Sequence, residues 1–273
     1  MFLSLFNSFA SALHPPDIIC LQDLPFWRSP LPCLNGFKSF CLSHSLSSKP
    51  KVALYVSGGF MSDGTVLPRF FDMPDVVALD LFGVDPFGRA FSQFRTLNSY
   101  NLWSQRSSVR TISPDLAFPD DGFPLLVVGD FNIHHPLAHP LRSYSCRDLA
   151  ASFPYFFRAA ELGFELLNLP RVFTRFTWDG VSRPSVIDLY FASPLLFPFF
   201  HSWDTSLPST GSDHIPISLT FAHPISAPLP PVPNWSLTDW TSLSPALSDL
   251  FISPSPSLPT RASLEAWFDT QLA

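Results

Sequence analysis

Apolar runs along the chain predict a series of short strands. The clearest is Leu125–Asp130, which is apolar without alternation and therefore predicts a strand covered on both faces. Other apolar runs predict strands at 17–23, 51–56, 76–82, 95–100, 172–178, 185–192 and 215–221. Asp179-Gly180 predicts a hairpin turn between the strands at 172–178 and 185–192, and Gly58-Gly59 predicts a turn after the second strand.

Helical spacing of apolar residues occurs in fewer places. Residues 3–13 predict an amphipathic helix that ends at His14-Pro15-Pro16. Residues 145–167 also have helical spacing, although Pro154 falls inside that span and can split a helix. Residues 25–50 are expected to be mostly loop.

A change in composition after Phe221 predicts a domain boundary. Residues 1–222 form one predicted domain. Residues 223–236 are rich in proline, which favours an extended linker. Residues 237–273 are acidic and predict a short helical connector, with helices at 237–250 and 264–272.

Composition narrows the possible functions. The chain has 273 residues, 46% of them hydrophobic, which suffices for one large domain with a buried core. The net charge of −6 argues against a protein that coats nucleic acid. Residues 89–183 nevertheless hold 10 Arg against 8 acidic residues, a net charge of +2, so a phosphate-facing surface is expected there. The four cysteines lack zinc-site spacing, and no apolar run predicts a membrane span.

Polar residues at the ends of predicted strands are the candidates for chemistry. Asp130 and Asn132 follow the most apolar strand, and their spacing places both side chains on one side of an extended chain. Such a pair can orient a water and a phosphate oxygen, although Asp and Asn are also common in ordinary turns. Asp23 ends the first predicted strand, a position that suits Mg²⁺.

Asp188 and His214 are expected to form a pair. Asp188 lies in an apolar strand, where a buried carboxylate needs a hydrogen-bonding partner. His214 follows Asp213 just before the last strand, and a histidine beside a buried carboxylate has a raised pKa and can donate to a phosphate oxygen. A nearby cluster of His134, His135 and His139 suggests zinc, but the interleaved prolines and the lack of a nearby cysteine favour a loop beside the site.

Taken in order, these segments resemble the endonuclease/exonuclease/phosphatase superfamily. The matching segments are Gln22-Asp23, Asn98-Ser99-Tyr100, Gly129-Asp130-Phe131-Asn132, Ile187-Asp188 and Ser212-Asp213-His214-Ile215-Pro216. The segments His134-His135-Pro136, Arg175-Phe176-Thr177-Trp178 and 183–194 resemble the endonuclease domains of non-LTR retrotransposons, especially fungal ones, cut off before the reverse transcriptase.

The resemblance implies an α/β fold, a four-layer sandwich of two mainly antiparallel sheets flanked by helices. It implies Mg²⁺-dependent cleavage of DNA phosphodiesters, with Mn²⁺ as a possible substitute for Mg²⁺. It also implies a protein that acts inside the cell, in the nucleus. Asp130 would activate water, Asn132 would hold Asp130 or a phosphate oxygen, and Tyr100 would contact the phosphate. His214, oriented by Asp188, would stabilise the phosphoryl oxygens, and Asp23 together with Asp213 would hold the metal.

The sequence also departs from the family pattern. The family's first strand, which carries an Asn near the metal, has no counterpart here, so one sheet is expected to have a gap and an unpaired edge. The family Glu is replaced by Asp23, which is one methylene shorter. Two alternatives to a DNA-nicking enzyme therefore stay open: a catalytically impaired or merely nucleic-acid-binding remnant, and a phosphatase of the same superfamily.

Overall fold

A computed structural model describes eleven parts of the chain. They are residues 16–24, 31, 33–41, 50–62, 64–69, 71, 75–84, 90–101, 112–176, 183–205 and 212–222. All of them belong to one compact unit, Met1–Leu229, and Pro230–Ala273 form a second unit. The helix predicted at 3–13, the linker at 223–236 and the helices at 237–250 and 264–272 lie outside the described residues.

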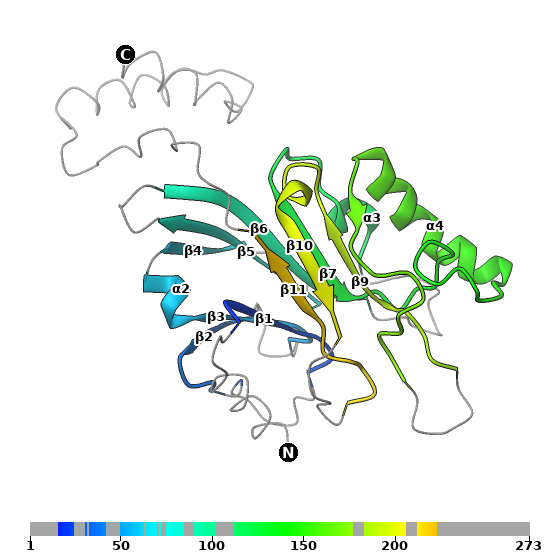
Figure 1. Ribbon diagram of the computed structural model, residues 1–273, viewed down its shortest axis with the longest axis horizontal. Coiled ribbons are helices and arrows are strands. Elements are labelled where there is room, and N and C mark those ends of the chain that lie inside the picture. The colour runs from blue at the N-terminus through cyan, green and yellow to red at the C-terminus, as the bar shows by residue number, and fades with distance from the viewer. Residues whose placement is uncertain are drawn as a thin grey trace, which may run out of the picture. The chain divides into compact units, whose positions relative to one another are not determined.

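A six-stranded sheet forms the centre of the domain (Figure 1). Its strands, in spatial order, are β4 (Gly64–Arg69), β5 (Val76–Val84), β6 (Ala90–Tyr100), β7 (Leu125–Asp130), β9 (Asp188–Ala192) and β8 (Glu165–Leu166). All neighbours are antiparallel except β6 and β7, which are parallel. Every residue of β7 is buried, which confirms the strand covered on both faces.

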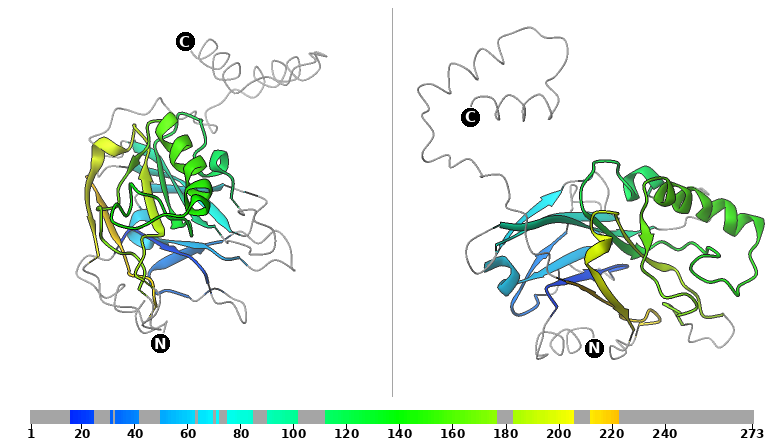
Figure 2. Two further views of the ribbon diagram at one scale, coloured as in Figure 1. Left: turned by 90° about the vertical axis from the view of Figure 1, so that its right-hand side faces the viewer. Right: turned by 45° about the horizontal axis from the view of Figure 1, so that its top comes forward.

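Two smaller antiparallel sheets cover one face of the central sheet. One contains β1 (Ile18–Leu21), β3 (Ala53–Ser57) and β2 (Phe37–Phe40) in that order, and the other pairs β10 (Phe200–Asp204) with β11 (Ser218–Phe221). Helices α3 (Pro114–Ala117) and α4 (Cys146–Glu161) cover the opposite face (Figures 1 and 2). This confirms the layered α/β sandwich with mainly antiparallel sheets.

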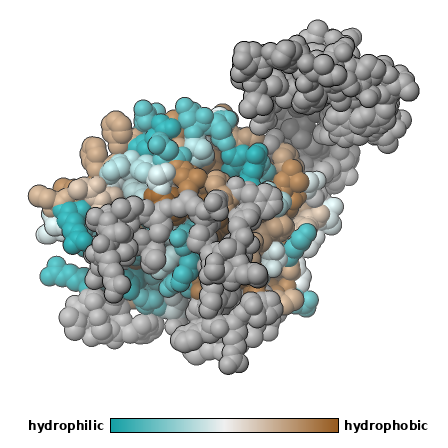
Figure 3. Space-filling view, turned by 180° about the vertical axis from the view of Figure 1, so that it is seen from behind, coloured by the Kyte–Doolittle hydropathy of each residue, from teal (hydrophilic) through white to brown (hydrophobic). Residues whose placement is uncertain are grey.

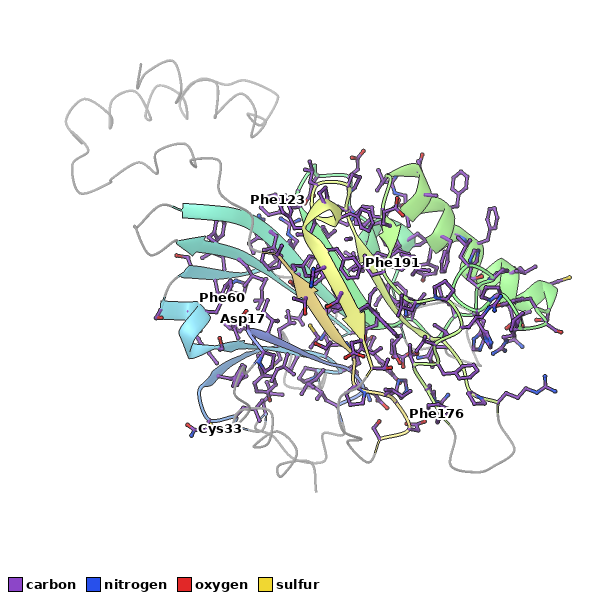
Figure 4. The ribbon with its side chains drawn as sticks, viewed as in Figure 1. Asp17, Cys33, Phe60, Phe123, Phe176 and Phe191 are labelled. Carbon is purple, nitrogen blue, oxygen red and sulfur yellow. The ribbon has the colours of Figure 1, made fainter. Side chains whose placement is uncertain are left out.

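Alternating residues of the central strands supply both sides of the core. Val76 and Ala78 of β5 pack toward the helices, whereas Val77 and Leu79 pack toward β3. Successive side chains of a strand point to opposite faces, so one apolar strand can serve two layers. Figure 4 shows Phe191 of β9 beside α4, where its ring meets Phe156 edge-on at 5.5 Å between centroids.

The second layer is split into two pieces. Among the described residues, β1 pairs with β3 and β11 pairs with β10, and the two pieces share no hydrogen-bonded strand pair. All four residues of β1 are only half-buried, whereas all five residues of β3 are buried. Cys20 of β1 packs against the core clusters beneath both pieces. The gap and unpaired edge expected from the sequence stay a prediction, because residues 1–15 lie outside the described residues.

Several predicted elements were wrong or incomplete. Gly58-Gly59 begin a short helix, α2 (Gly58–Ser62), rather than a turn, and Ser57 Oγ caps it by accepting from Phe60 N at 3.1 Å. The loop expected over 25–50 contains β2, and α4 runs unbroken through Pro154. The last strand begins at Ser218 rather than residue 215, since Pro216 lacks the N–H that a ladder requires.

The predicted hairpin at 172–192 is only partly present. Residues 177–182, which include Asp179-Gly180, lie outside the described residues. Arg175 and Ser185 form an isolated antiparallel bridge, and a regular strand begins only at Asp188. The hydroxyl of Thr174 accepts from the backbone N–H groups of Ile187 and Asp188, both at 3.1 Å, so a side chain takes the place of the expected ladder.

The described helices do not include one that is long and apolar enough to cross a bilayer. Polar and apolar residues are interspersed over the described part of the face shown in Figure 3.

Gly129 permits the close approach of β6 and β7 that positions the end of β7. A Cβ atom at residue 129 would lie 2.1 Å from the backbone oxygen of Ser99. Gly129→Ala is therefore expected to push the strands apart and cost about 3 kcal/mol. In a domain of this size that lowers Tm by about 5–10 °C, measurable by calorimetry. Gly59→Ala is the control, because a Cβ there meets nothing within 4 Å; an equal loss in both variants would contradict this prediction.

Candidate active site

Three neighbouring strands bring the predicted polar residues together at one end of the central sheet. In the parallel pair β6–β7, Tyr100 is the Cα partner of Asp130. In the antiparallel pair β7–β9, Asp188 is the Cα partner of Asp130 on the other side. Asp130 therefore lies between Tyr100 and Asp188, where β7 ends and β9 begins.

Asp130 is the central carboxylate of the site. The residue is 4% exposed, and its Oδ1 accepts from the backbone N–H of Asn132 at 2.9 Å. Asn132 has a φ of +49°, a left-handed conformation that Asn tolerates better than most residues. The interaction expected between Asn132 and Asp130 is therefore made, at least in part, by the backbone N–H of Asn132, which donates to the carboxylate of Asp130.

Burial and charge crowding raise the pKa of Asp130 to about 7. Burial is the larger cause, and the negative charge of Asp188 adds to it. The charges of His214 and Arg175 and the bond from Asn132 oppose this rise. A carboxyl group with a pKa near neutrality is suited to accept a proton from water at physiological pH.

His214 is paired with Asp188, as predicted. Its Nδ1 lies 3.0 and 2.9 Å from the two carboxylate oxygens of Asp188, so the Nδ1–H donates to that carboxylate. Its Nε2 lies 4.0 Å from Oδ2 of Asp130. Burial lowers the pKa of His214, but the hydrogen bond and charge of Asp188 and the charges of Asp130 and Asp213 outweigh it, so the pKa rises to about 9. The imidazolium form is therefore the resting state at neutral pH.

Two residues that the sequence did not single out hold Asp188 in place. Asn168, which is 4% exposed, donates from Nδ2 to the backbone oxygen of Asp188 at 2.9 Å and accepts from Tyr190 N through Oδ1 at 2.9 Å. Thr174, which is fully buried, accepts the backbone N–H of Asp188. Buried side-chain amides and hydroxyls pair with backbone groups in this way, but their partners lie 14 and 20 residues away and cannot be read from the chain.

Tyr100 connects Asp23, which follows β1, with Asp130 at the end of β7. It is 8% exposed, and its hydroxyl is hydrogen-bonded to Asp23. Burial raises the pKa of Tyr100, and the charges of Asp23 and Asp130 raise it further. Gln22, the residue before Asp23, donates to Oδ1 of Asn98 at 2.6 Å, and Asn98 in turn donates to the backbone oxygens of Leu21 and Ala53. The buried Asn98 thereby fixes the end of β1 against β6.

The two residues predicted to hold metal have different surroundings. Asp23 has a side chain 64% exposed, a φ of +46° and Lys51 Nζ at 3.8 Å. Asp213 instead pairs with Arg175, whose Nε lies 2.8 Å from its Oδ2. Among the described residues, the group whose ligand atoms all lie within 4.8 Å of one another is Asp130, Asp188 and His214. Asp23 does not belong to this group, but its exposed carboxylate is hydrogen-bonded to Tyr100, and an accessible carboxylate is the kind of oxygen ligand that a divalent cation binds.

The histidine loop after Asn132 packs against aromatic rings. His135 stacks on Phe156 with centroids 3.7 Å apart, and burial lowers its pKa. His139 meets Phe173 edge-on at 5.2 Å, and His134 Nδ1 lies 3.1 Å from a guanidinium nitrogen of Arg142. Each imidazole thus contacts a different residue, and the three rings are not shown to converge on one point. This favours the interpretation as a loop beside the site over a shared zinc site.

Comparison with known proteins agrees with this geometry. Residues 94–218, which include Tyr100, Asp130, Asp188 and His214, match the protein family described as endonuclease-reverse transcriptase. This matched segment covers most of β6 and all of β7 and β9, with the residues around the site that these strands carry, and it is similar in sequence to that family. No curated protein sequence matches the chain.

Solved structures share the fold of this domain at low sequence identity. The endonuclease domain of TRAS1, a telomere-specific non-LTR retrotransposon, is 17% identical, with a TM-score of 0.54 over 81% of this chain and 90% of that one. The catalytic domain of APE2 from Xenopus laevis is 16% identical, with a TM-score of 0.58 over 83% and 90%. A 3′ phosphatase from Neisseria bound to a product DNA hairpin is 17% identical, with a TM-score of 0.51 over 77% and 90%.

Proposed function

We propose that this domain hydrolyses phosphodiester bonds of DNA with the help of a divalent cation, Mg²⁺ or Mn²⁺. The observation that carries the proposal is the arrangement of Asp130 between Tyr100 and the Asp188–His214 pair at the end of β7. It combines one carboxyl group that can accept a proton with one imidazolium that can donate a proton or stabilise negative charge. The family match to endonuclease-reverse transcriptases and the fold of DNA-acting structures support DNA as the substrate. The proposal includes a location in the nucleus, where such a substrate lies.

In the proposed mechanism, Asp130 orients a water molecule and accepts its proton as the water attacks phosphorus. His214 faces Asp130 through Nε2 and stabilises the charge that develops on the phosphoryl oxygens, while Asp188 keeps its ring in place. Tyr100 and Asn132 border the phosphate. Asp23 is the first candidate to hold the cation, with Asp213 as the second. When bound, such an ion supplies Lewis-acid stabilisation of the leaving oxygen.

Nicking of supercoiled plasmid tests the proposal. The protein is expected to convert supercoiled plasmid to open circles with Mg²⁺, to stop when EDTA is added, and to resume when Mg²⁺ is restored. The products are separated on an agarose gel. Nicking that persists in EDTA contradicts the role of the cation. An absence of nicking with Mg²⁺ and with Mn²⁺, in a protein that unfolds cooperatively, favours the impaired remnant.

A phosphatase is the second candidate, because one structure of the same fold is a 3′ phosphatase. The same site could act on a terminal phosphate, since attack on phosphorus needs the same base and charge stabilisation. Release of inorganic phosphate from a 3′-phosphorylated oligonucleotide, without nicking of plasmid, would replace the nicking proposal with this one.

The pH dependence of nicking follows from the two perturbed groups. Asp130 must be deprotonated and His214 protonated, so kcat/KM is expected to rise with pH up to about 7 and to fall through about 9. A bound cation near Asp130 moves the midpoint of the acid limb to a pH below 7, because positive charge favours the carboxylate form of Asp130. The profile is measured on plasmid at saturating Mg²⁺. A rate that keeps rising above pH 10 would contradict the role of the imidazolium.

A further inference from the structure

Three short segments lie side by side at the active site, and Arg175 occupies the middle one. On one side, Arg175 N donates to the backbone oxygen of Ser185, and Ser185 N donates back to Arg175 O, both at 3.0 Å. On the other side, Phe176 N donates to Asp213 O at 2.7 Å, and Ile215 N donates to Thr174 O at 2.8 Å. The two outer segments lead directly into Asp188 and His214. Asp188 and His214 therefore come from the two outer segments, and the segment that contains Arg175 lies between these two segments and bonds to both.

The side chain of Arg175 adds an ion pair to this backbone clamp. Its Nε lies 2.8 Å from Oδ2 of Asp213, and the two side chains are 38% and 33% exposed. A partly buried, hydrogen-bonded pair is stronger than a fully exposed one. Because Asp213 directly precedes His214, fixing the carboxylate of Asp213 also restricts the backbone from which the imidazole projects.

The charge balance of the site points the same way. Asp130, Asp188 and Asp213 all interact electrostatically with His214, so three carboxylates face one imidazolium. Arg175 is a second cation in this group, and its charge acts on both Asp213 and Asp130. Without it, the carboxylate of Asp213 would be uncompensated beside His214 and could compete with Asp188 for the ring.

We propose that Arg175 is a positioning residue that, through its ion pair with Asp213, keeps His214 bound to Asp188. This inference rests on the proposed function only for its kinetic consequences, since the His214–Asp188 contact can be observed without any reaction. The role belongs to the side chain, because the backbone bonds of residue 175 persist whatever residue stands there.

The test uses four variants: Arg175→Gln, Arg175→Lys, Asp213→Asn and the double variant Arg175→Gln/Asp213→Asn. Proton NMR of the full chain provides the readout that does not depend on activity. The Nδ1–H of a histidine bound to a carboxylate gives a far-downfield resonance, which His214→Gln assigns by removing it. The resonance is expected to be lost or broadened in Arg175→Gln and retained in Arg175→Lys, which keeps the charge. Persistence of the resonance in Arg175→Gln overturns the proposal.

Kinetics separate positioning from direct substrate contact. Arg175→Gln is expected to lower kcat for plasmid nicking about 30-fold with little change in KM, because misplacing a reacting group by about 1 Å can cost up to about 100-fold. The double variant is expected to lose no more than the worse single variant, since both changes remove one contact. A raised KM with unchanged kcat, or losses that multiply in the double variant, would show instead that Arg175 acts on the substrate by itself.

The control is Arg158→Gln, which removes an arginine that pairs with Glu161 and Asp115 on the helical face. It is expected to leave both the resonance and kcat unchanged. If the wild-type protein does not nick DNA at all, the proposed function fails while the NMR comparison still decides the role of Arg175.

Discussion

Replacing Asp130 by asparagine is expected to lower the rate of plasmid nicking about 1,000-fold, because a general base contributes about 100- to 10,000-fold to such reactions. Asparagine has the size of aspartate, so the packing around β7 is preserved. It cannot accept a proton from water, and it removes one of the three negative charges that act on the imidazole of His214. The loss is expected in kcat rather than in KM.

The same substitution is expected to stabilise the fold at neutral and higher pH. The pKa of Asp130 in the folded protein, about 7, lies above its ordinary value of 3.8. The folded state therefore binds the proton more tightly than the unfolded state, and stability falls as pH rises from about 4 to about 7. Asparagine cannot ionise and avoids this loss. Thermal unfolding at pH 8 is expected to show a Tm for Asp130→Asn equal to or above that of the wild type.

Asp115→Asn is the matched control for Asp130→Asn. Asp115 lies in α3 with its side chain 83% exposed, and its partner is Arg158. This change is expected to alter neither nicking nor Tm. If Asp130→Asn lost activity together with a lower Tm, the loss would reflect damage to the fold and the assignment of Asp130 as the base would be wrong.

The site was more predictable than the fold around it, for a physical reason. Asp130 follows a run of apolar residues, and Asp188 interrupts another. A buried carboxylate needs a partner, so the positions of these two residues already implied that they have one. The pairing of Asp188 with His214 was predicted in this way and is confirmed at 2.9 Å.

Two of the strands that escaped prediction, β4 and β2, have only a weak apolar pattern. The strand β4 reads GTVLPR, with Gly64 and Pro68 that normally argue against a strand, and β2 reads FKSF with an exposed middle. Each is stabilised by pairing with a neighbour, β5 for β4 and β3 for β2, and not by its own pattern. Tertiary pairing of this kind is not visible in a local window of sequence.

Asp80 shows how a missed strand also hides a partner. It lies in the middle of β5, 1% exposed, within a strand whose prediction was confirmed. Its carboxylate accepts from Arg69 of β4 and Arg95 of β6, both through Nε at 2.6 Å. Because β4 was not predicted, the pairing of Asp80 with Arg69, which helps to make a buried aspartate tolerable there, was not predicted either. Arg175 belongs to one of the segments that carry the family resemblance. Its ion pair with Asp213 nevertheless joins residues 38 positions apart in the chain, so no local pattern predicts it.

Replacing Asp188 by asparagine is expected to lower nicking by about 100- to 1,000-fold and also to move the pH profile, because the carboxylate both orients the imidazole and holds its charge. Without that charge, the pKa of His214 is expected to fall from about 9 toward its ordinary value of 6.5. The pKa of Asp130 is expected to fall as well, because the negative charge of Asp188 helps to raise it. Both limbs of the profile therefore move to lower pH.

Stability gives an independent check on Asp188→Asn. In the wild type, the pKa of His214 is raised in the folded state, so its stabilising effect is complete below about pH 6.5 and is lost as pH rises through about 9. In Asp188→Asn this effect shrinks, so the difference in Tm between variant and wild type is expected to be larger at pH 6 than at pH 9.5. Suppose instead that the variant loses activity, that its pH profile does not move, and that the Tm difference is the same at pH 6 and pH 9.5. Asp188 would then not act through the charge of His214.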